Sequence, residues 1–225
     1  MTPILQINCA GAKDLADVTA GLEQAAIAHA IDLHIDHDRM LSEFGCLWMI
    51  ARSSVRLERL PKGEFQVTTW LRKPTAAISN RDFSLRDSEG EFGSAVQSWV
   101  LADAEHRKLV NLKTIPVLWE LPAPEPERTE LPKRFKLPQE LSACAEWTVD
   151  PTQIDGNGHL NNVWYIRRAE SLAPQNCLSL DVSFDRECFV GETLTLEAGL
   201  GDGFFVRGVK GDGLESFRAR FGGSL

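Results

Sequence analysis

A proline-rich segment near the middle of the chain constrains the fold more than any other feature of the sequence. Six of the eleven prolines lie between residues 116 and 138, among Glu, Lys and Arg side chains. Proline has no backbone N–H and resists both helices and central strands, so this segment is expected to cross the surface in extended form. It predicts a linker at residues 116–142 between an N-terminal domain, 1–115, and a C-terminal domain, 143–225. A long surface loop inside one domain is the alternative.

The first half has the pattern of one helix followed by strands. Apolar residues recur at helical spacing from Asp14 to about Ala30, and Asp14 is a suitable N-cap. Four segments of near-alternating polarity follow, separated by turn signals that contain Gly or Pro. One helix with about four antiparallel strands predicts a sheet wrapped around a single helix. The expected strands are Trp48–Glu58, Phe65–Arg72, Arg81–Asp87 and Ser94–Asp103.

The second half repeats this order of elements. A helix is expected from about Asn161 to Leu172, and four strand-like segments follow it with glycine-containing turns between them. A helix and a sheet that occur twice in one chain favour an α+β protein made by tandem duplication. The expected strands are Leu178–Glu187, Thr193–Gly199, Phe204–Lys210 and Glu215–Phe221.

Charge and composition exclude several classes of function. The formal net charge is -8, whereas binding of nucleic acid needs clustered positive charge, so no nucleic-acid partner is expected. No window approaches the roughly 20 apolar residues of a membrane helix, and residues 1–9 lack a secretory pattern. A cytoplasmic protein without a membrane span is therefore expected. The five scattered cysteines form no C-x-x-C pair, which argues against a disulfide framework and a structural zinc site.

The strongest signal for chemistry lies just before the second helix. Asp155, Asn157 and His159 alternate with glycines, so in extended backbone they can point to one side while the glycines let a substrate approach. A helix start lies next to them, its free amides can stabilise an oxyanion, and imidazole transfers protons near neutral pH. A capped loop without function would show the same Asp-Gly and Asn-Gly steps. The residues alone leave both interpretations open.

Two segments resemble the active-site motifs of acyl-acyl-carrier-protein thioesterases of the plant plastid and bacterial type. The first runs from Asp155 to Tyr165 and reads D-x-N-x-H-L-N-N-x-x-Y. The second reads F-D-R-E-C and ends at Cys188, and it is similar to an aromatic, basic and Glu-Cys segment of that family. The first half resembles the family in the order of its segments. The matching positions there include Gln24-Ala25-Ala26-Ile27-Ala28-His29, Trp48, Arg59-Leu60-Pro61, Thr69-Trp70 and Ser98-Trp99-Val100-Leu101.

The resemblance implies a tandem, or double, hot-dog fold, in which the first half binds the acyl chain and the second half carries the catalytic residues. It implies that the backbone amides near Gly158 and Leu160 stabilise the oxyanion, and that neither a metal nor another cofactor is required. The catalytic group carried over to this sequence is Asp155, Asn157, His159 and Glu187.

Each of these four residues has an expected role. Glu187 would be the general base that activates water. Asn157 and His159 would orient the water or the thioester carbonyl, and Asp155 would hold the loop in position.

Cys188 is the alternative nucleophile, since Cys, His and Asn can form a covalent catalytic set. In the expected strand it shares the parity of Leu180 and Val182, which places it on the apolar face, whereas Glu187 falls on the polar face. A buried apolar thiol is a poor nucleophile, which favours Glu187 as the reacting group. A bulge near Arg186 would reverse this parity.

The implied partner is acyl carrier protein (ACP), which is acidic, so a basic docking patch is expected. Two rival functions remain: an acyl-coenzyme A thioesterase on the same fold, and a non-catalytic acyl-binding hot-dog protein. Two hot dogs in one chain can supply the pairing that single-domain relatives achieve as dimers, so a monomer is expected, with a homodimer as the alternative. The candidate patches are Arg167-Arg168, Arg72-Lys73, and Lys133-Arg134 with Lys136.

Overall fold

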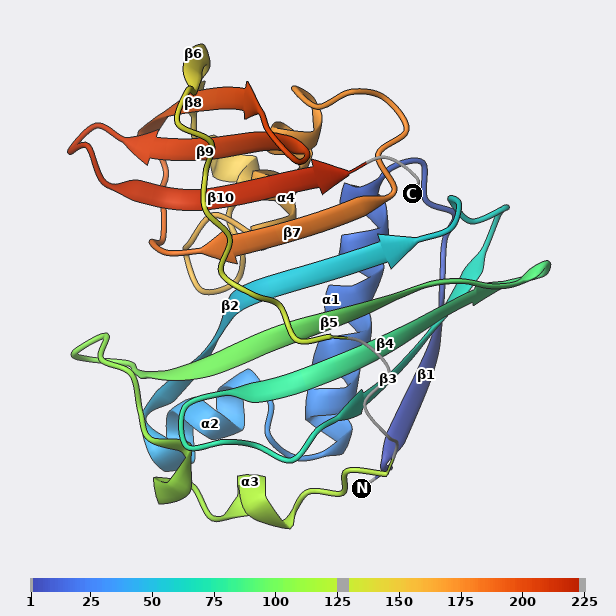
Figure 1. Ribbon diagram of the computed structural model, residues 1–225. Coiled ribbons are helices and arrows are strands. Elements are labelled where there is room, and N and C mark those ends of the chain that lie inside the picture. The colour runs from blue at the N-terminus through green and yellow to red at the C-terminus, as the bar shows by residue number, and fades with distance from the viewer. Residues whose placement is uncertain (1, 125–129, 223–225) are drawn as a thin grey trace.

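The computed structural model describes residues 2–124 and 130–222 (Figure 1). Within them, ten strands form one antiparallel sheet in the order β1-β3-β4-β5-β2-β7-β10-β9-β8-β6. The strands are β1 (Ile4–Cys9), β2 (Cys46–Leu57), β3 (Phe65–Leu71), β4 (Ser79–Asp87), β5 (Gly90–Asp103), β6 (Ser142–Thr148), β7 (Ser179–Phe184), β8 (Thr193–Leu200), β9 (Phe204–Lys210) and β10 (Glu215–Gly222). The α-helices are α1 (Leu15–Asp32), α2 (His37–Phe44), α3 (Val117–Glu120) and α4 (Asn162–Glu170).

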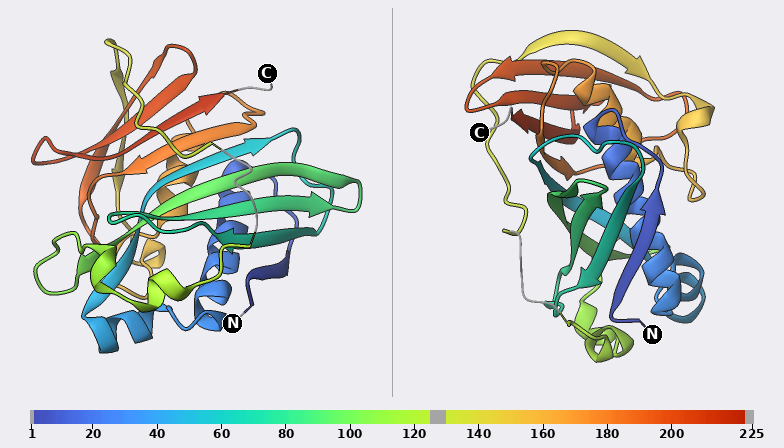
Figure 2. Two further views of the ribbon diagram at one scale, coloured as in Figure 1. Left: turned by 60° about the horizontal axis from the view of Figure 1, so that its bottom comes forward. Right: turned by 90° about the vertical axis from the view of Figure 1, so that its right-hand side faces the viewer.

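The two halves of the sheet have the same strand order. The first half runs β1-β3-β4-β5-β2 and the second runs β6-β8-β9-β10-β7. They join where β2 pairs with β7, from Arg52 opposite Ser183 to Arg56 opposite Ser179. Both α1 and α4 lie on the same side of the sheet and pack against each other (Figures 1 and 2). The α+β class and the double hot-dog expected from the resemblance are confirmed.

Local sequence explains where the two central helices begin. Asp14 caps α1 by accepting a hydrogen bond from the Asp17 amide at 2.7 Å, and Asn161 caps α4 by accepting one from the Val163 amide at 2.8 Å. One continuous hydrophobic core then buries the inner faces of both helices against both halves of the sheet. The two halves therefore share their core as well as their sheet.

The prediction of four strands in each half was wrong, because each half has a further strand before its helix. Both of these strands, β1 and β6, are at the edges of the sheet and pair on one side only. Six of the seven residues of β6 are exposed or half-buried, so it lacks the alternation of a half-buried strand. The prediction for β7 was too long, since the strand ends at Phe184.

The predicted linker contains one short helix, α3, and then an extended segment. Residues 130–141 include no helix or strand and cross the face of the sheet opposite α1 and α4 (Figure 2). Phe135 anchors this segment, because its carbonyl accepts a hydrogen bond from Arg218 at 3.2 Å and its ring lies against Phe205. Residues 125–129 of the predicted linker lie outside the described residues. The domain limits at 115/116 and 142/143 stay a prediction.

Candidate functional site

The loop before α4 is organised around one carboxylate. Asp155 Oδ1 accepts hydrogen bonds from the amides of Asn157 at 2.8 Å and His159 at 3.2 Å. The Asp155 amide in turn donates to the His159 carbonyl at 2.8 Å. Gly158 closes this turn with a φ of 81°, a conformation that favours glycine. The geometry gives Asp155 the loop-holding position expected from the sequence.

The two motif segments meet at this loop. His159 Nδ1 lies 3.4 Å from Glu187 Oε1, and the edge of the His159 ring contacts Phe189. A hydrogen bond of 2.9 Å from the Leu160 amide to the Cys188 carbonyl ties the loop to the segment after β7. The structure thus places Asp155, Asn157, His159 and Glu187 along one cavity.

Arg107 reaches this site from the first half and was missed by the sequence reasoning. Its guanidinium lies 3.1 Å from Glu187 Oε1 and 3.2 Å from His159 Nε2. It belongs to the turn after β5, where its amide donates to the Asp103 carbonyl at 2.9 Å. Eighty positions separate Arg107 from Glu187 in the sequence, and no local pattern marks it.

Cys188 lies behind the site instead of in it. Its side chain is fully buried and its sulfur lies 3.1 Å from the Ser216 hydroxyl, which donates to the Arg186 carbonyl at 2.7 Å. Glu187 is 24% exposed and faces the cavity. Although β7 ends before both residues, the arrangement is the one that the parity argument predicts.

The amides of Gly158 and Leu160 are already engaged within the protein. Gly158 donates to the Asp155 carbonyl at 3.1 Å and Leu160 donates to the Cys188 carbonyl. The expectation that these two amides bind the oxyanion is therefore wrong for this structure, because a hydrogen bond inside the loop occupies each of them. The first amide of α4, that of Asn162, has no partner among the described residues, and Asn162 lines the cavity.

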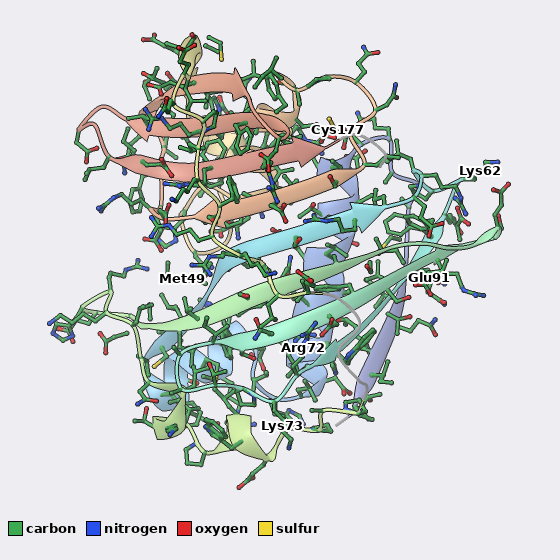
Figure 3. The ribbon with its side chains drawn as sticks, in the orientation of Figure 1. Met49, Lys62, Arg72, Lys73, Glu91 and Cys177 are labelled. Carbon is green, nitrogen blue, oxygen red and sulfur yellow. The ribbon has the colours of Figure 1, made fainter. Side chains whose placement is uncertain are left out.

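A cavity of about 580 Å³ leads away from the site and is built by both halves. Its volume falls within the usual range for small-molecule sites, about 300–1,000 Å³. Its walls are mostly apolar where it runs along α1 and β2, and Figure 3 labels one wall residue, Met49, on β2. The apolar wall residues of the first half include Ala26, Ile27, Ala30, Ile35, Leu47, Trp48, Met49, Ile50, Leu71 and Trp99.

Glu23 is a second cavity residue that the sequence reasoning missed. Its Oε2 accepts a hydrogen bond from Asn161 Nδ2 at 3.4 Å, and its Oε1 is sealed from solvent without a partner among the described residues. Burial raises the pKa of Glu23 to about 7, the bond from Asn161 opposes this rise, and the charge of Asp155 adds to it. The residue keeps some exposed surface, and it contributes to the cavity wall.

A family model described as the acyl-ACP thioesterase N-terminal domain matches residues 2–114. This match covers half of the chain. The chain belongs to the acyl-ACP thioesterase family. It is accordingly a thioester hydrolase whose substrates are acyl-ACP thioesters. A search of curated proteins with the sequence gives no match.

Solved structures show the fold of this thioesterase in other proteins. An acyl-ACP thioesterase from Bacteroides thetaiotaomicron has a TM-score of 0.86 at 21% identity, covering 97% of each chain. A 12:0-ACP thioesterase from Umbellularia californica has a TM-score of 0.83 at 20% identity, covering 98% of this chain and 97% of the other. A MaoC-like dehydratase from Phytophthora capsici has a TM-score of 0.55 at 15% identity, covering 79% and 72%. At these identities the likeness shows the fold alone.

Each of the three basic patches expected on this thioesterase has one residue paired with a carboxylate within the protein. Arg72 forms a buried ion pair of 2.5 Å with Asp82, whereas its neighbour Lys73 is exposed (Figure 3). Arg167 pairs with Asp17 at 2.7 Å, and Arg168 lies over the Trp147 ring. In the linker, Lys133 pairs with Glu130 at 2.7 Å.

None of the described helices is long and apolar enough to cross a membrane.

Proposed function

We propose that the chain hydrolyses fatty acyl-ACP by water attack, with Glu187 as the general base. The observation that carries this proposal is the meeting of His159 and Glu187 in the lining of a cavity that both halves build and whose wall along α1 and β2 is mostly apolar. A carboxylate within reach of a bound water, next to an imidazole, is the arrangement that general-base hydrolysis needs.

In the proposed reaction, Glu187 takes one proton from water as the water oxygen bonds to the thioester carbon. The carbonyl π electrons move to its oxygen, and a tetrahedral oxyanion forms. The oxyanion then collapses, the C–S bond breaks, and the thiolate of the carrier takes up the proton from Glu187. The products are the free fatty acid and the carrier thiol.

The neighbours of Glu187 have supporting roles in this proposal. His159 orients the attacking water or the carbonyl oxygen. Asn157 can do the same, because its side-chain amide has no hydrogen-bond partner among the described residues and faces the cavity. Arg107 acts as a positioning residue, since it bridges the carboxylate and the imidazole from the first half. Asp155 holds the loop.

Cys188 is not the nucleophile in this proposal. A covalent mechanism needs the thiol to reach the thioester carbon within about 3–3.5 Å. The Cys188 side chain is instead fully buried against Ser216 and is absent from the cavity lining.

The acyl chain is proposed to lie in the apolar cavity along α1, and ACP to dock at the end where Glu187 and Arg107 lie. The carrier is favoured over coenzyme A by the family of this chain. The relative from Umbellularia californica is described as a 12:0-ACP thioesterase. Action in the cytoplasm and the monomeric state stay predictions, and light scattering tests the second of them.

The test is release of free fatty acid from matched acyl-ACP and acyl-coenzyme A esters by four proteins: wild type, Glu187→Ala, Glu187→Gln and Cys188→Ala. We expect preference for the carrier-protein esters, a loss of kcat of about 10²–10⁴-fold in both Glu187 variants, and a change below about threefold in Cys188→Ala. Activity that survives in Glu187→Gln but not in Cys188→Ala would establish the covalent mechanism instead. Acyl binding without hydrolysis in wild type would leave the acyl-binding reading.

A further inference from the structure

The internal repeat places two glutamates in equivalent positions. Glu23 on α1 and Glu170 on α4 are each the ninth residue after the N-cap of their helix, Asp14 and Asn161. Because α1 and α4 pack against each other, each glutamate reaches the start of the other helix. The two starts nevertheless bind their glutamates differently.

At the start of α1 the glutamate satisfies the helix. The two carboxylate oxygens of Glu170 accept the amide hydrogens of Leu15 and Ala16, at 2.9 Å each. A carboxylate at a helix N-terminus meets both the free amides and the positive end of the helix dipole. The carboxylate of Glu170 therefore occupies the free amides at the start of α1. We call such a helix start closed.

At the start of α4 the glutamate binds a side chain and no backbone amide. Glu23 Oε2 is held by the side chain of Asn161, whose Oδ1 already caps the Val163 amide. Glu23 Oε1 has no partner in the described part of the chain, and neither has the Asn162 amide. This helix start thus remains open, and its first residue, Asn162, lines the same cavity as Asp155 and His159.

The charge on Glu23 decides what this open start can bind. A second negative group beside a developing oxyanion repels it, and in a site of low dielectric the repulsion is strong. Asp155 is the charged group that acts on Glu23 directly, from the loop before α4. Arg81 of β4 also lines the cavity, as do the charged or titratable residues of the site and of the segment after β7: Arg107, His159, Asp185, Arg186 and Glu187.

Two further elements border this cavity with titratable groups. Asp36, His37 and Asp38 lie at the start of α2, and Tyr165 lies on α4. Burial raises the pKa of Tyr165 far above its ordinary value, so its phenol stays neutral over the working range of pH.

We propose that Glu23 is a positioning residue for thioester hydrolysis. As a neutral acid it accepts the hydrogen bond from Asn161 and keeps the Asn162 amide available to bind the oxyanion. When it is ionised, its negative charge destabilises that oxyanion. This inference rests on the proposed function of the site. It accounts for why equivalent glutamates differ, since Glu170 closes a start that has no reaction to serve. Because the raised pKa of Glu23 is about 7, the residue changes charge within the pH range of the kinetic test that follows.

The test is the pH dependence of kcat and KM on one acyl-ACP substrate, from about pH 5.5 to 9, for wild type, Glu23→Gln and Glu170→Gln. Glutamine keeps the shape of the neutral acid and cannot ionise. We expect wild-type kcat to fall above about pH 7, and the fall to be absent in Glu23→Gln, which should exceed wild type by about tenfold or more at the alkaline end. KM should change little, because the repulsion acts on the transition state.

Two variants separate this role from a structural one. Glu170→Gln is the matched control: it should lower the melting temperature, because α1 loses its carboxylate cap, and keep the wild-type pH profile. Glu23→Ala removes the bond to Asn161 and should lower kcat at every pH, whereas Glu23→Gln should retain the wild-type rate near pH 6 within a few-fold.

The inference is overturned if Glu23→Gln keeps the alkaline fall of wild type, or if it is inactive near pH 6, since either result shows that the neutral form is not what the site needs. A wild-type protein that hydrolyses no acyl-ACP at any pH would instead refute the proposed function. The two failures are therefore distinguishable.

Discussion

The buried carboxyl of Glu23 predicts a pH-dependent stability that can be measured without substrate. Its pKa in the folded protein is about 7, against an ordinary value of 4.5. The folded state therefore binds a proton that the unfolded chain releases at lower pH, and the free energy of unfolding falls as the pH rises through this window. This difference of pKa corresponds to a loss of about 3 kcal/mol in the free energy of unfolding. The loss is complete above pH 7.

Glu23→Gln removes this effect because glutamine does not titrate. We expect the free energy of unfolding of the variant, relative to wild type, to rise by about 3 kcal/mol between about pH 4.5 and 8. Urea unfolding at several pH values, followed by the fluorescence of the six tryptophans, measures this difference.

An exposed carboxyl supplies the control for this measurement. Glu91 lies at the start of β5, far along the sheet from the site, where Figure 3 labels it. Glu91→Gln removes one negative charge without opening a buried site, so the comparison corrects for the change of net charge. A stability difference for Glu23→Gln that stays flat with pH, or that merely follows the one for Glu91→Gln, would refute the reasoning that Glu23 is held neutral in the folded protein.

Three further predictions follow from single contacts. Arg107→Met should lower kcat about tenfold, because the arginine contacts Glu187 in the site. It should change the free energy of unfolding by less than about 1 kcal/mol, because the arginine is exposed. An unchanged kcat would show that Arg107 has no positioning role. Asp155→Ala leaves two loop amides without their acceptor and should lower kcat more than it raises KM, which steady-state kinetics checks. Asp82→Ala removes one side of the buried ion pair with Arg72 and should cost about 3–5 kcal/mol in urea unfolding.

The sequence predicted those parts of the fold that have strong local signals. Asp14 and Asn161 cap the helices as expected, because capping depends on neighbouring residues only. The inner strands were found through their alternating apolar residues, and β9 was predicted to the residue. The edge strand β6 was missed because it is mostly exposed and lacks the apolar alternation of an inner strand. The other edge strand, β1, was missed although it alternates, with Leu5, Ile7 and Cys9 on one face.

The site divides in the same way. Asp155, Asn157 and His159 form one short motif, and the resemblance supplied Glu187, so these residues could be named from the sequence. Contacts between the halves could not, because they depend on how β2 meets β7 and how α1 meets α4. The availability of the Gly158 and Leu160 amides was also predicted wrongly, because it depends on which carbonyl each amide donates to in the folded protein.

The same repeat argues against a second candidate site of this kind at the start of α1. Counted back from the two N-caps, the positions of Asn157 and His159 correspond to Ala10 and Ala12 in the first half, which carry no polar group. The helix start beside them is closed by Glu170. The first half thus lacks counterparts of Asn157 and His159 and of the open amide, and it contributes cavity walls, Arg107 and Glu23 to the candidate site before α4. The resemblance implies that the first half binds the acyl chain and the second carries the catalytic residues; the cavity lining shows that the first half also brings the charged side chains of Arg107 and Glu23 to the candidate site.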